Sequence, residues 1–465
     1  MKALLSRRVS LQAALALAAA LFGGCSTTLP PAADAARPPI VFVHGNGDTS
    51  ALWHTTVWRF ESNGWPRERL HAIDVPYPLA RDDDTKPQDG RTSTTEHMQY
   101  LSMEVDRVLA ATGARQVVLI GNSRGGNAIR NYIANGGGAA KVSHAILGGT
   151  PNHGVWADAA LRPGSEFNGA GAFLRALNTP PGANGNEVTP GPQWLTIRSD
   201  DNDKFAQPDG VWIGSKGTPT NVGFDGPELK GASNVMIAGI DHRETSFSPQ
   251  AFDAAFRFIS GRAPATLAVT PEAVVVLGGK VSGLGLNNEA GRGNFVNNLA
   301  LVGARVEVFA TDPASGARRG GALLTQTITA DGRWGPLRTD AQTALEFTVT
   351  APGFATTHIY RAPFARSSAL VNLRAERIAD TDRDAASVVA LTRPRGYFGL
   401  PRDRITLDGQ SPPAGIAPGT AGVSVAKLKL KGDAGRAVHS EFNGERIVGR
   451  AWPAAENHLV FLELH

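Results

Sequence analysis

A serine lies between two glycines in the segment 120–126, which reads Ile-Gly-Asn-Ser-Arg-Gly-Gly. Ser123 directly follows the apolar run 117–120 and directly precedes a helical pattern. Glycine at positions 121 and 125 would let a strand turn sharply into a helix, because side chains there would meet the neighbouring backbone. Such a turn exposes the serine hydroxyl at the N-terminus of the helix. We therefore expect Ser123 to be a nucleophile.

A serine nucleophile needs a base, because its hydroxyl is weakly nucleophilic near neutral pH. Among the eleven histidines, His242 follows the last predicted strand of the first half of the chain and precedes the last helical pattern there. This place completes the chain order serine, acid, histidine that accompanies the motif. The candidate acids that could orient this histidine are Asp200, Asp201, Asp203 and Asp158. The alternative interpretation of the acidic cluster at 200–203 is a solvated loop or a weak calcium site, although its spacing does not match an EF-hand loop.

Predicted strands and helices alternate around these residues over 38–262. The apolar run 40–43 is followed by His-Gly and is typical of a strand buried on both faces of a parallel sheet. Ser93 and Glu96 form a capping box in front of an amphipathic helical pattern. The pattern predicts an α/β fold, a mostly parallel sheet flanked by helices, with an insertion at about 155–192 that is rich in Gly, Asn and Pro.

The chain from residue 263 onward has a different pattern. Short alternating runs are separated by turn signals such as Asp331-Gly332, and helical periodicity disappears. We expect an all-β region, with a β-sandwich domain over 263–375 and a second β unit over 376–465. This part of the sequence has no cluster of metal-ligand type and no glycine-rich phosphate loop, so we expect neither a metal nor a cofactor. The aromatic residues expected in the core or at the corners of the sandwich, rather than in a ligand platform, are Trp334, Phe354, Tyr360 and Tyr397.

The first 25 residues are typical of a signal peptide, with a basic start and an apolar run too short for a membrane span. Arg7 and Arg8 resemble a twin-arginine leader, and Phe22 to Cys25 resemble a lipobox whose cysteine is acylated after cleavage. A chance cysteine at an ordinary cleavage site is the alternative. The segment 26–37 is a Pro/Ala-rich linker. We therefore expect an exported protein, in the periplasm, in the cell envelope or outside the cell, with a membrane anchor where Cys25 is acylated.

The number of cysteines and the net charge exclude some features and partners of the protein. Cys25 is the only cysteine, so no intramolecular disulfide is expected. The formal net charge of +4 falls to +1 when the leader is removed, because the leader contains Lys2, Arg7 and Arg8. This balance argues against a nucleic-acid partner, which needs a concentrated basic surface. The oligomeric state cannot be predicted from these features.

Residues 38–262 resemble α/β-hydrolase lipases and esterases. The segments that carry the resemblance read Val-Phe-Val-His-Gly-Asn-Gly, Gly-Asn-Ser-Arg-Gly-Gly, Leu-Gly-Gly-Thr-Pro-Asn-His-Gly, Ser-Asp-Asp-Asn-Asp and Gly-Ile-Asp-His. The sequence departs from the common lipase pattern at Asn122, where histidine is usual, and at Arg124, a charged residue after the nucleophile. The arrangement also resembles certain prokaryotic lipases in which a C-terminal β domain helps to bind lipid.

This resemblance implies a serine carboxylester hydrolase, in particular a triacylglycerol lipase, that needs no cofactor and acts on an ester or lipid. Ser123 would attack the ester and form an acyl-enzyme, and His242 would relay the proton. Asp203 would orient the imidazole, because the residues after it resemble the acid loop of many hydrolases, and Asp201 is the alternative acid. The insertion at about 155–192 would lie where such hydrolases carry a lid.

The resemblance also places the donors for the oxyanion. The backbone N–H groups of Asn46 and Arg124 would hold the negative charge that develops on the carbonyl oxygen. His44 would be a structural residue, because it precedes the whole triad in the chain.

Two other functions are compatible with the same residues. A polyester depolymerase, for example one acting on polyhydroxyalkanoate, would use the same triad and hold solid polymer with its β domain. A catalytically inactive surface binding protein would retain the hydrolase domain only as a scaffold. The triad residues do not choose between ester and amide substrates.

Overall fold

The computed structural model describes residues 37–200, 203, 219–286, 294–418, 422–432 and 434–465. Residues Pro38–His465 form one compact unit. The expected signal peptide, Cys25, most of the linker and the alternative acid Asp201 lie outside the described residues. No helix within the described ranges is both long and apolar enough to span a membrane.

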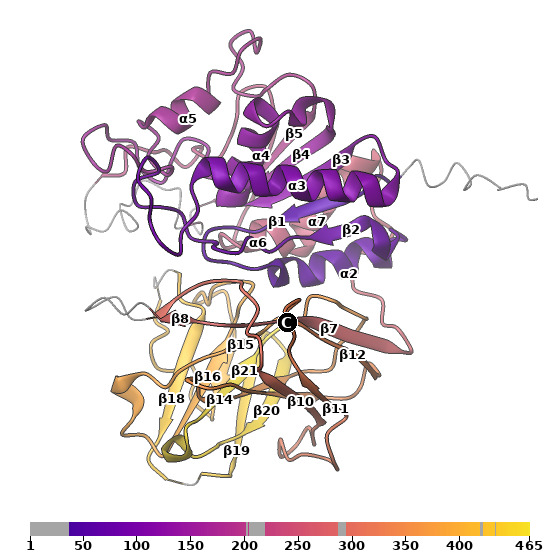
Figure 1. The fold of residues 1–465 in the computed structure, drawn as a ribbon, viewed down its shortest axis with the longest axis vertical. Helices are drawn as coiled ribbons and strands as arrows, with labels where there is room; N and C mark the ends of the chain where they lie inside the picture. The colour runs from indigo at the N-terminus through magenta and orange to yellow at the C-terminus, as the bar shows by residue number, and fades with distance from the viewer. Residues whose placement is uncertain (1–36, 201–202, 204–218, 287–293, 419–421, 433) are drawn as a thin grey trace, which may run out of the picture. The chain divides into compact units, whose positions relative to one another are not determined.

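The first half of the unit is built on a six-stranded sheet in the order β2-β1-β3-β4-β5-β6, and every strand pairs in parallel with its neighbours (Figure 1). Its strands are β1 (Ile40–Val43), β2 (Leu70–Ala72), β3 (Val117–Asn122), β4 (Val142–Gly148), β5 (Gln193–Ser199) and β6 (Ser233–Ile237). The helices are α2 (His54–Ser62), α3 (Thr94–Thr112), α4 (Arg124–Asn135), α5 (Ala172–Leu177), α6 (Glu244–Phe247) and α7 (Pro249–Ser260). This confirms the predicted α/β-hydrolase fold.

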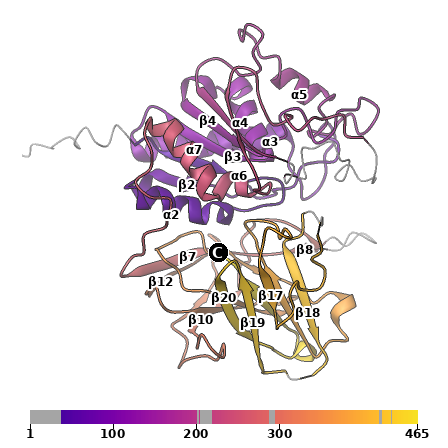
Figure 2. The same ribbon diagram turned by 180° about the vertical axis from the view of Figure 1, so that it is seen from behind.

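Both faces of the sheet are covered, as the apolar strand runs predicted. Val41 and Val43 of β1 pack against α3 and α4, whereas Ile40 and Phe42 pack against α2 and α7. Successive side chains of a strand point to opposite faces, so a run that is apolar at every position needs a helical layer on each side. Helix α3 lies over the face turned to the viewer in Figure 1, and α7 lies over the opposite face, seen in Figure 2.

Helix α3 has the ends that the sequence predicted. The Ser93 side chain accepts a hydrogen bond from the Glu96 N–H group, and the Glu96 side chain accepts one from the Ser93 N–H group, which completes the capping box. Gly113 ends the helix with a φ of 65°, a conformation that favours glycine.

The second half of the unit is rich in β-structure, as expected. A seven-stranded sheet has the order β11-β10-β13-β14-β21-β16-β18, beside three smaller sheets in the orders β12-β7-β15, β17-β19-β20 and β8-β9. Its strands are β7 (Val275–Gly283), β8 (Gly285–Leu286), β9 (Asn294–Phe295), β10 (Arg305–Ala310), β11 (Leu324–Thr327), β12 (Arg333–Thr339), β13 (Leu345–Thr350), β14 (Thr356–Arg361), β15 (Leu373–Ala375), β16 (Ser387–Thr392), β17 (Ile405–Leu407), β18 (Val425–Leu430), β19 (Ala437–Phe442), β20 (Glu445–Arg450) and β21 (His458–Glu463).

The seven-stranded sheet crosses the division expected between 263–375 and 376–465. Strand β21, near the C-terminus, lies between β14 and β16 and pairs in parallel with both. One apolar cluster gathers around Trp334 and Phe347 and another around Leu391 and Leu462. The β region therefore has two large cores that share one sheet, and the bounds of the two expected units stay a prediction.

Helix α2 joins the hydrolase region to the β region. The Trp58 indole is buried in the first β core and donates to the Ser367 carbonyl at 2.9 Å. The ring Nδ1 of His54 lies 2.9 Å from the Ser368 hydroxyl, and Arg366 pairs with Glu61 at 3.1 Å. The same helix therefore contributes side chains to both regions.

Candidate active site

Ser123 lies at the turn between β3 and α4, in a backbone conformation that L-residues rarely adopt. Its φ and ψ are 52° and −123°, and its N–H group donates to the Gly148 carbonyl at 2.8 Å. A Cβ at position 121 would come within 2.8 Å of the Gly125 backbone, and one at position 125 within 2.4 Å of the Val43 carbonyl oxygen. Both glycines are therefore required by close backbone approach, as the motif predicted.

His242 follows β6 and contacts Asp203. The ring Nδ1 lies 2.9 Å from each carboxylate oxygen of Asp203, and both side chains are almost fully buried. A carboxylate can only accept, so Nδ1 carries the proton and Nε2 is the nitrogen left to act as a base.

Asn122 holds the loop that carries His242. Its side-chain N–H₂ group donates to the carbonyl oxygens of His242 and Gly148, each at 3.2 Å. Gly149 provides room beneath the ring, because a Cβ there would lie 3.1 Å from the His242 Nδ1 and 2.9 Å from its carbonyl oxygen. The departure from the usual lipase pattern at position 122 thus places an amide where it fastens the histidine loop.

The other candidate acids have different partners. The Asp200 carboxylate accepts from the Ser199 hydroxyl at 3.1 Å and from the Gly239 N–H group at 3.0 Å. The Asp158 carboxylate accepts from the Ala160 N–H group at 2.8 Å. Asp203 is thus the described candidate whose carboxylate reaches His242, and Asp201 lies outside the described residues.

The loop after β1 lies directly beside the serine. A Cβ at Gly45 would be 3.0 Å from the Ser123 Cβ, and the Asn46 side chain fixes the loop by accepting from the Ala80 N–H group at 2.7 Å. Arg124 is the first residue of α4, where a backbone N–H group has no intrahelical acceptor. This arrangement keeps the two N–H groups expected to bind the oxyanion close to the serine.

His44 supports this loop and has no free ring nitrogen. Its Nε2 accepts from the Val75 N–H group at 3.1 Å, so the proton is on Nδ1, which donates to the Gly45 carbonyl at 2.9 Å. Burial lowers the pKa of His44. A neutral imidazole with both nitrogens occupied has a structural role, as the resemblance implied.

The side chain of Arg124 is turned into the protein. Its guanidinium makes two hydrogen bonds to Glu166, at 2.8 and 2.9 Å, and both residues are 2% exposed or less. Another guanidinium nitrogen donates to the Pro78 carbonyl at 3.0 Å. Because Glu166 belongs to the insertion, this buried ion pair ties the insertion to the helix that begins after Ser123.

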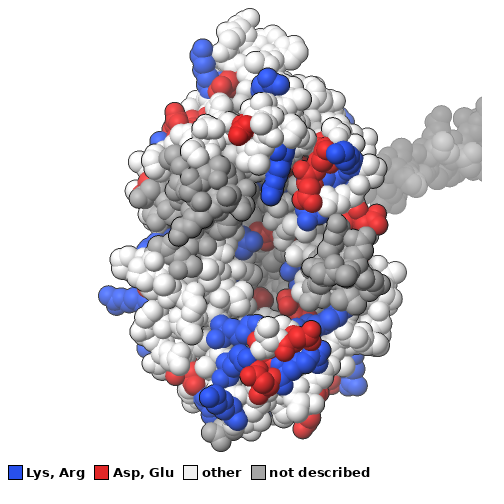
Figure 3. Space-filling view, turned by 90° about the vertical axis from the view of Figure 1, so that its left-hand side faces the viewer, with Lys and Arg blue, Asp and Glu red and all other residues white. Residues whose placement is uncertain are grey.

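A cavity of about 280 Å³ brings the serine, the histidine and the oxyanion loop together. Ser123, His242 and Asn46 line it, and the insertion adds Trp156 and Phe167 to its wall. The lining also contains basic and acidic side chains, and Figure 3 shows a hollowed face of the molecule with both kinds of charge around the hollow. The charged lining residues are Arg81, Arg91, Arg162, Arg243, Asp48 and Asp82.

The β region also reaches this cavity. Tyr397 lines it and stacks against the guanidinium of Arg243, which lies 4.9 Å from the ring centre. Arg393 donates to Asp241 at 2.8 Å and to Glu244 at 2.6 Å, so it holds the residues on both sides of His242 and Arg243. We call these contacts the Arg393 clamp.

The Arg393 clamp is extended by neighbouring groups of the same loop. The Tyr397 N–H group donates to Asp241 at 2.8 Å, and Arg402 donates to Glu244 at 2.8 Å. Sequence reasoning missed these residues and assigned Tyr397 to the core, because more than 150 residues separate the partners and no local pattern marks such a contact. The only signal in the sequence was the acidic residues flanking His242. They indicate that a basic partner is needed, but they do not indicate where in the chain it lies.

Comparison with known proteins agrees with this architecture. Residues 38–184 match the family described as alpha/beta hydrolase fold, and residues 273–378 match the family described as lipase C-terminal domain. Among solved structures, the chain is similar to the mature form of the lipase BlEst2 from Bacillus licheniformis, with 20% identity, coverage of 48% of this chain and 92% of that chain, and a TM-score of 0.34.

Two further structures are similar at the same level. For lipase B from Aspergillus fumigatus the identity is 17%, the coverage is 50% of this chain and 54% of that chain, and the TM-score is 0.35. For phospholipase PlaB from Legionella pneumophila the corresponding values are 12%, 74%, 95% and 0.33. The chain thus has the α/β-hydrolase fold, and part of its β region matches the lipase C-terminal domain family.

Proposed function

We propose that the protein hydrolyses carboxylic esters of lipids, as a lipase, through an acyl-enzyme on Ser123. The observation that carries the proposal is the hydrogen bond between His242 and Asp203, because His242 lines the same cavity as Ser123 in its strained turn. A serine, an imidazole oriented by a carboxylate and two backbone N–H groups are the parts that acyl transfer requires.

In the first half of the reaction, the Ser123 hydroxyl adds to the ester carbonyl while the His242 Nε2 takes its proton. Asp203 stabilises the imidazolium that forms, and the N–H groups of Asn46 and Arg124 donate to the oxyanion. The imidazolium then protonates the leaving alkoxide, and the alcohol departs. Water repeats the sequence with His242 as base, which releases the carboxylic acid and restores the serine.

The cavity wall supports an apolar acyl group. Trp156, Phe167 and Val155 of the insertion and Tyr397 of the β region provide large apolar surfaces beside Ser123. The arginines at the same cavity would lie near the polar part of the ester. We infer that the insertion and the β region share the task of binding substrate.

A chain-length series tests the proposal. The mature chain, without its leader, is assayed on p-nitrophenyl esters from acetate to palmitate, with Ser123→Ala as the matched control. Turnover that depends on Ser123 and favours the longer chains is expected for a lipase. Equal turnover by wild type and Ser123→Ala would exclude the mechanism, and absence of turnover by wild type would favour an inactive binding protein.

We also propose that residues 1–25 direct export and that Cys25 receives a lipid anchor. The support is the basic and apolar leader that ends in Gly-Gly-Cys. Labelling of cells with radioactive palmitate should mark the wild-type protein and not Cys25→Ala. Equal labelling of both proteins would contradict the anchor.

A further inference from the structure

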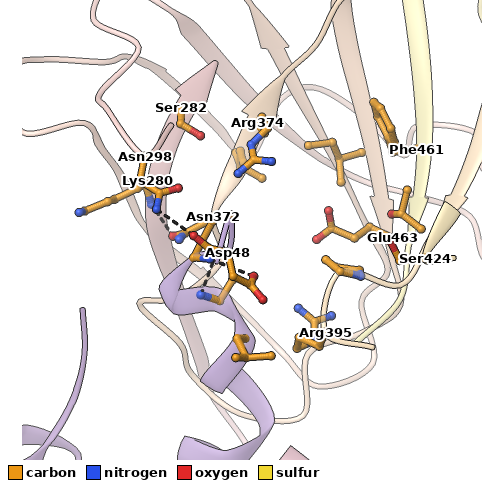
Figure 4. A pocket seen from close by; sticks show the side chains of 18 of the residues that line it. Asp48, Lys280, Ser282, Asn298, Asn372, Arg374, Arg395, Ser424, Phe461 and Glu463 are labelled. Carbon is orange, nitrogen blue, oxygen red and sulfur yellow. Dashed lines mark hydrogen bonds between the residues drawn. The ribbon is translucent and has the colours of Figure 1, made fainter. Parts of the chain in front are cut away.

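A second cavity, of about 250 Å³, lies against the active-site cavity, and both share Asp48 and Arg243 as lining residues. Its other walls come from the hydrolase loops around Asp74 and from the β region (Figure 4). The β region contributes Arg374 and Arg395, whose side chains face the cavity from two sides in Figure 4. The proposed reaction uses neither arginine.

The acidic groups on this wall already have partners. Asp48 pairs with Arg243 at 3.2 Å, and Asp74 accepts from the Ser50 N–H group at 2.7 Å and pairs with Lys280 at 3.3 Å. Glu463 forms an ion pair with Arg361. Burial raises the pKa of the remaining acid, Glu376, although Arg374 beside it acts in the opposite direction.

The two arginines have acidic neighbours, but within the described residues each lacks a hydrogen-bond partner at one nitrogen. The Nε atoms of Arg374 and Arg395 are buried and have no hydrogen-bond partner within the described part of the chain, and the same holds for the Thr392 hydroxyl. Arg395 is 2% exposed and donates to a neutral acceptor, the Leu464 carbonyl. Burial and the nearby Arg361 lower the pKa of Arg395 to about 9, whereas Glu463 and Glu445 act in the opposite direction.

We propose that this cavity binds an oxyanion, a carboxylate or a phosphate, between Arg374 and Arg395. The planar N–H groups of a guanidinium match two oxygens of such an anion, and the Thr392 hydroxyl supplies a further donor. Buried N–H groups without acceptors are costly, so the oxygens of an anion would supply the hydrogen bonds that these side chains lack. The cavity, of about 250 Å³, has room for a phosphate or a short carboxylate.

The anion has two possible sources. Ester cleavage in the adjoining cavity would release a carboxylate, and only this source rests on the proposed function. Inorganic phosphate from solution has the same recognition chemistry. The experiment below separates the two.

Calorimetric titrations with sodium phosphate and sodium butanoate, at matched ionic strength, test the site in the full mature chain. Arg374→Gln is compared with Arg338→Gln, which removes the same charge from an exposed position of the β region. We expect wild type and Arg338→Gln to bind alike and Arg374→Gln to bind at least tenfold more weakly. Equal binding by all three proteins, or no binding by wild type, would overturn the proposal.

Two further measurements complete the test. Arg374→Lys keeps the charge but loses the planar N–H groups of the guanidinium, so it should bind the anion with intermediate affinity. It replaces Arg374→Gln should that variant not fold. Butanoate that inhibits ester hydrolysis by wild type more than by Arg374→Gln would identify the product as the source, and binding of phosphate alone would identify the solution anion. Anion binding by a protein without esterase activity would leave this site standing and reject the proposed function.

Discussion

Replacement of Arg393 by alanine is expected to loosen the segment that carries His242. The guanidinium is 7% exposed and bonds to Asp241 at 2.8 Å and to Glu244 at 2.6 Å. The variant leaves two largely buried carboxylates without this partner. Breaking a buried ion pair on one side costs about 3–5 kcal/mol. We expect the low end, about 3 kcal/mol, because the Tyr397 N–H group still donates to Asp241 and Arg402 still donates to Glu244.

The effect on catalysis should appear in kcat rather than in KM. Arg393 does not line the active-site cavity, so substrate contacts are preserved, whereas the position of the imidazole relative to Ser123 is not. A small displacement of a catalytic group costs as much as about a hundredfold in rate. Arg393→Lys retains the charge and should recover part of both losses.

Urea unfolding and steady-state kinetics on a p-nitrophenyl ester measure both effects. Arg446→Ala is the control, because its ion pair with Glu441 also lies in the β region and is exposed on both sides, and such pairs contribute about 0–1 kcal/mol. The reasoning would be refuted by an Arg393→Ala protein that is as stable and as active as Arg446→Ala.

Two other predictions concern pH and the serine turn. Burial lowers the pKa of several histidines, so the unfolded chain binds protons there more readily, and the free energy of unfolding should fall as pH drops below about 6.5. Urea unfolding between about pH 7.5 and 5.5 should show a smaller loss of unfolding free energy for His97→Gln than for wild type or for the exposed-site variant His439→Gln. Equal losses in the three proteins would contradict burial of the histidines as the cause. Gly125→Ala would place a Cβ 2.4 Å from the Val43 carbonyl oxygen and should cost about 3 kcal/mol or more, whereas Gly321→Ala, with no atom within 4 Å, should change thermal unfolding very little, so equal melting temperatures would contradict the packing argument. The histidines concerned are His44, His54, His97 and His465.

Local patterns were sufficient for the hydrolase fold and for its turn at Ser123. Apolar runs bounded by glycines specify buried parallel strands, and the capping box at Ser93 specifies the start of α3, because these signals act between residues close in the chain. The location of His242 after the last strand followed from chain order alone. Asp203 as the residue that orients it was inferred from the resemblance, and the structure places its carboxylate against the ring. The contact of Asn122 with the histidine loop could not be predicted, because it depends on side chains that only the folded sheet brings together.

The β region was harder to predict for the same reason. Alternating runs identified strands, but the pairing of β21 with both β14 and β16 joins residues that are far apart in the chain, such as Thr356 with His458 and Val389 with Val460, and alternation says nothing about such partners. Tyr397 was assigned to the core on its aromatic character and instead lines the active-site cavity. Arg124 is a charged residue beside the nucleophile in the sequence, and its burial against Glu166 became visible only in three dimensions.

Covalent labelling of the serine tests the central claim most directly. The mature protein is treated with an alkyl phosphonate ester, and the modified peptide is identified by mass spectrometry, in wild type and in Asp203→Asn. The account predicts one adduct per chain, located on Ser123, and a much slower reaction in Asp203→Asn because the imidazole is no longer held in the required tautomer. No adduct on Ser123, or equal labelling rates in the two proteins, would contradict it.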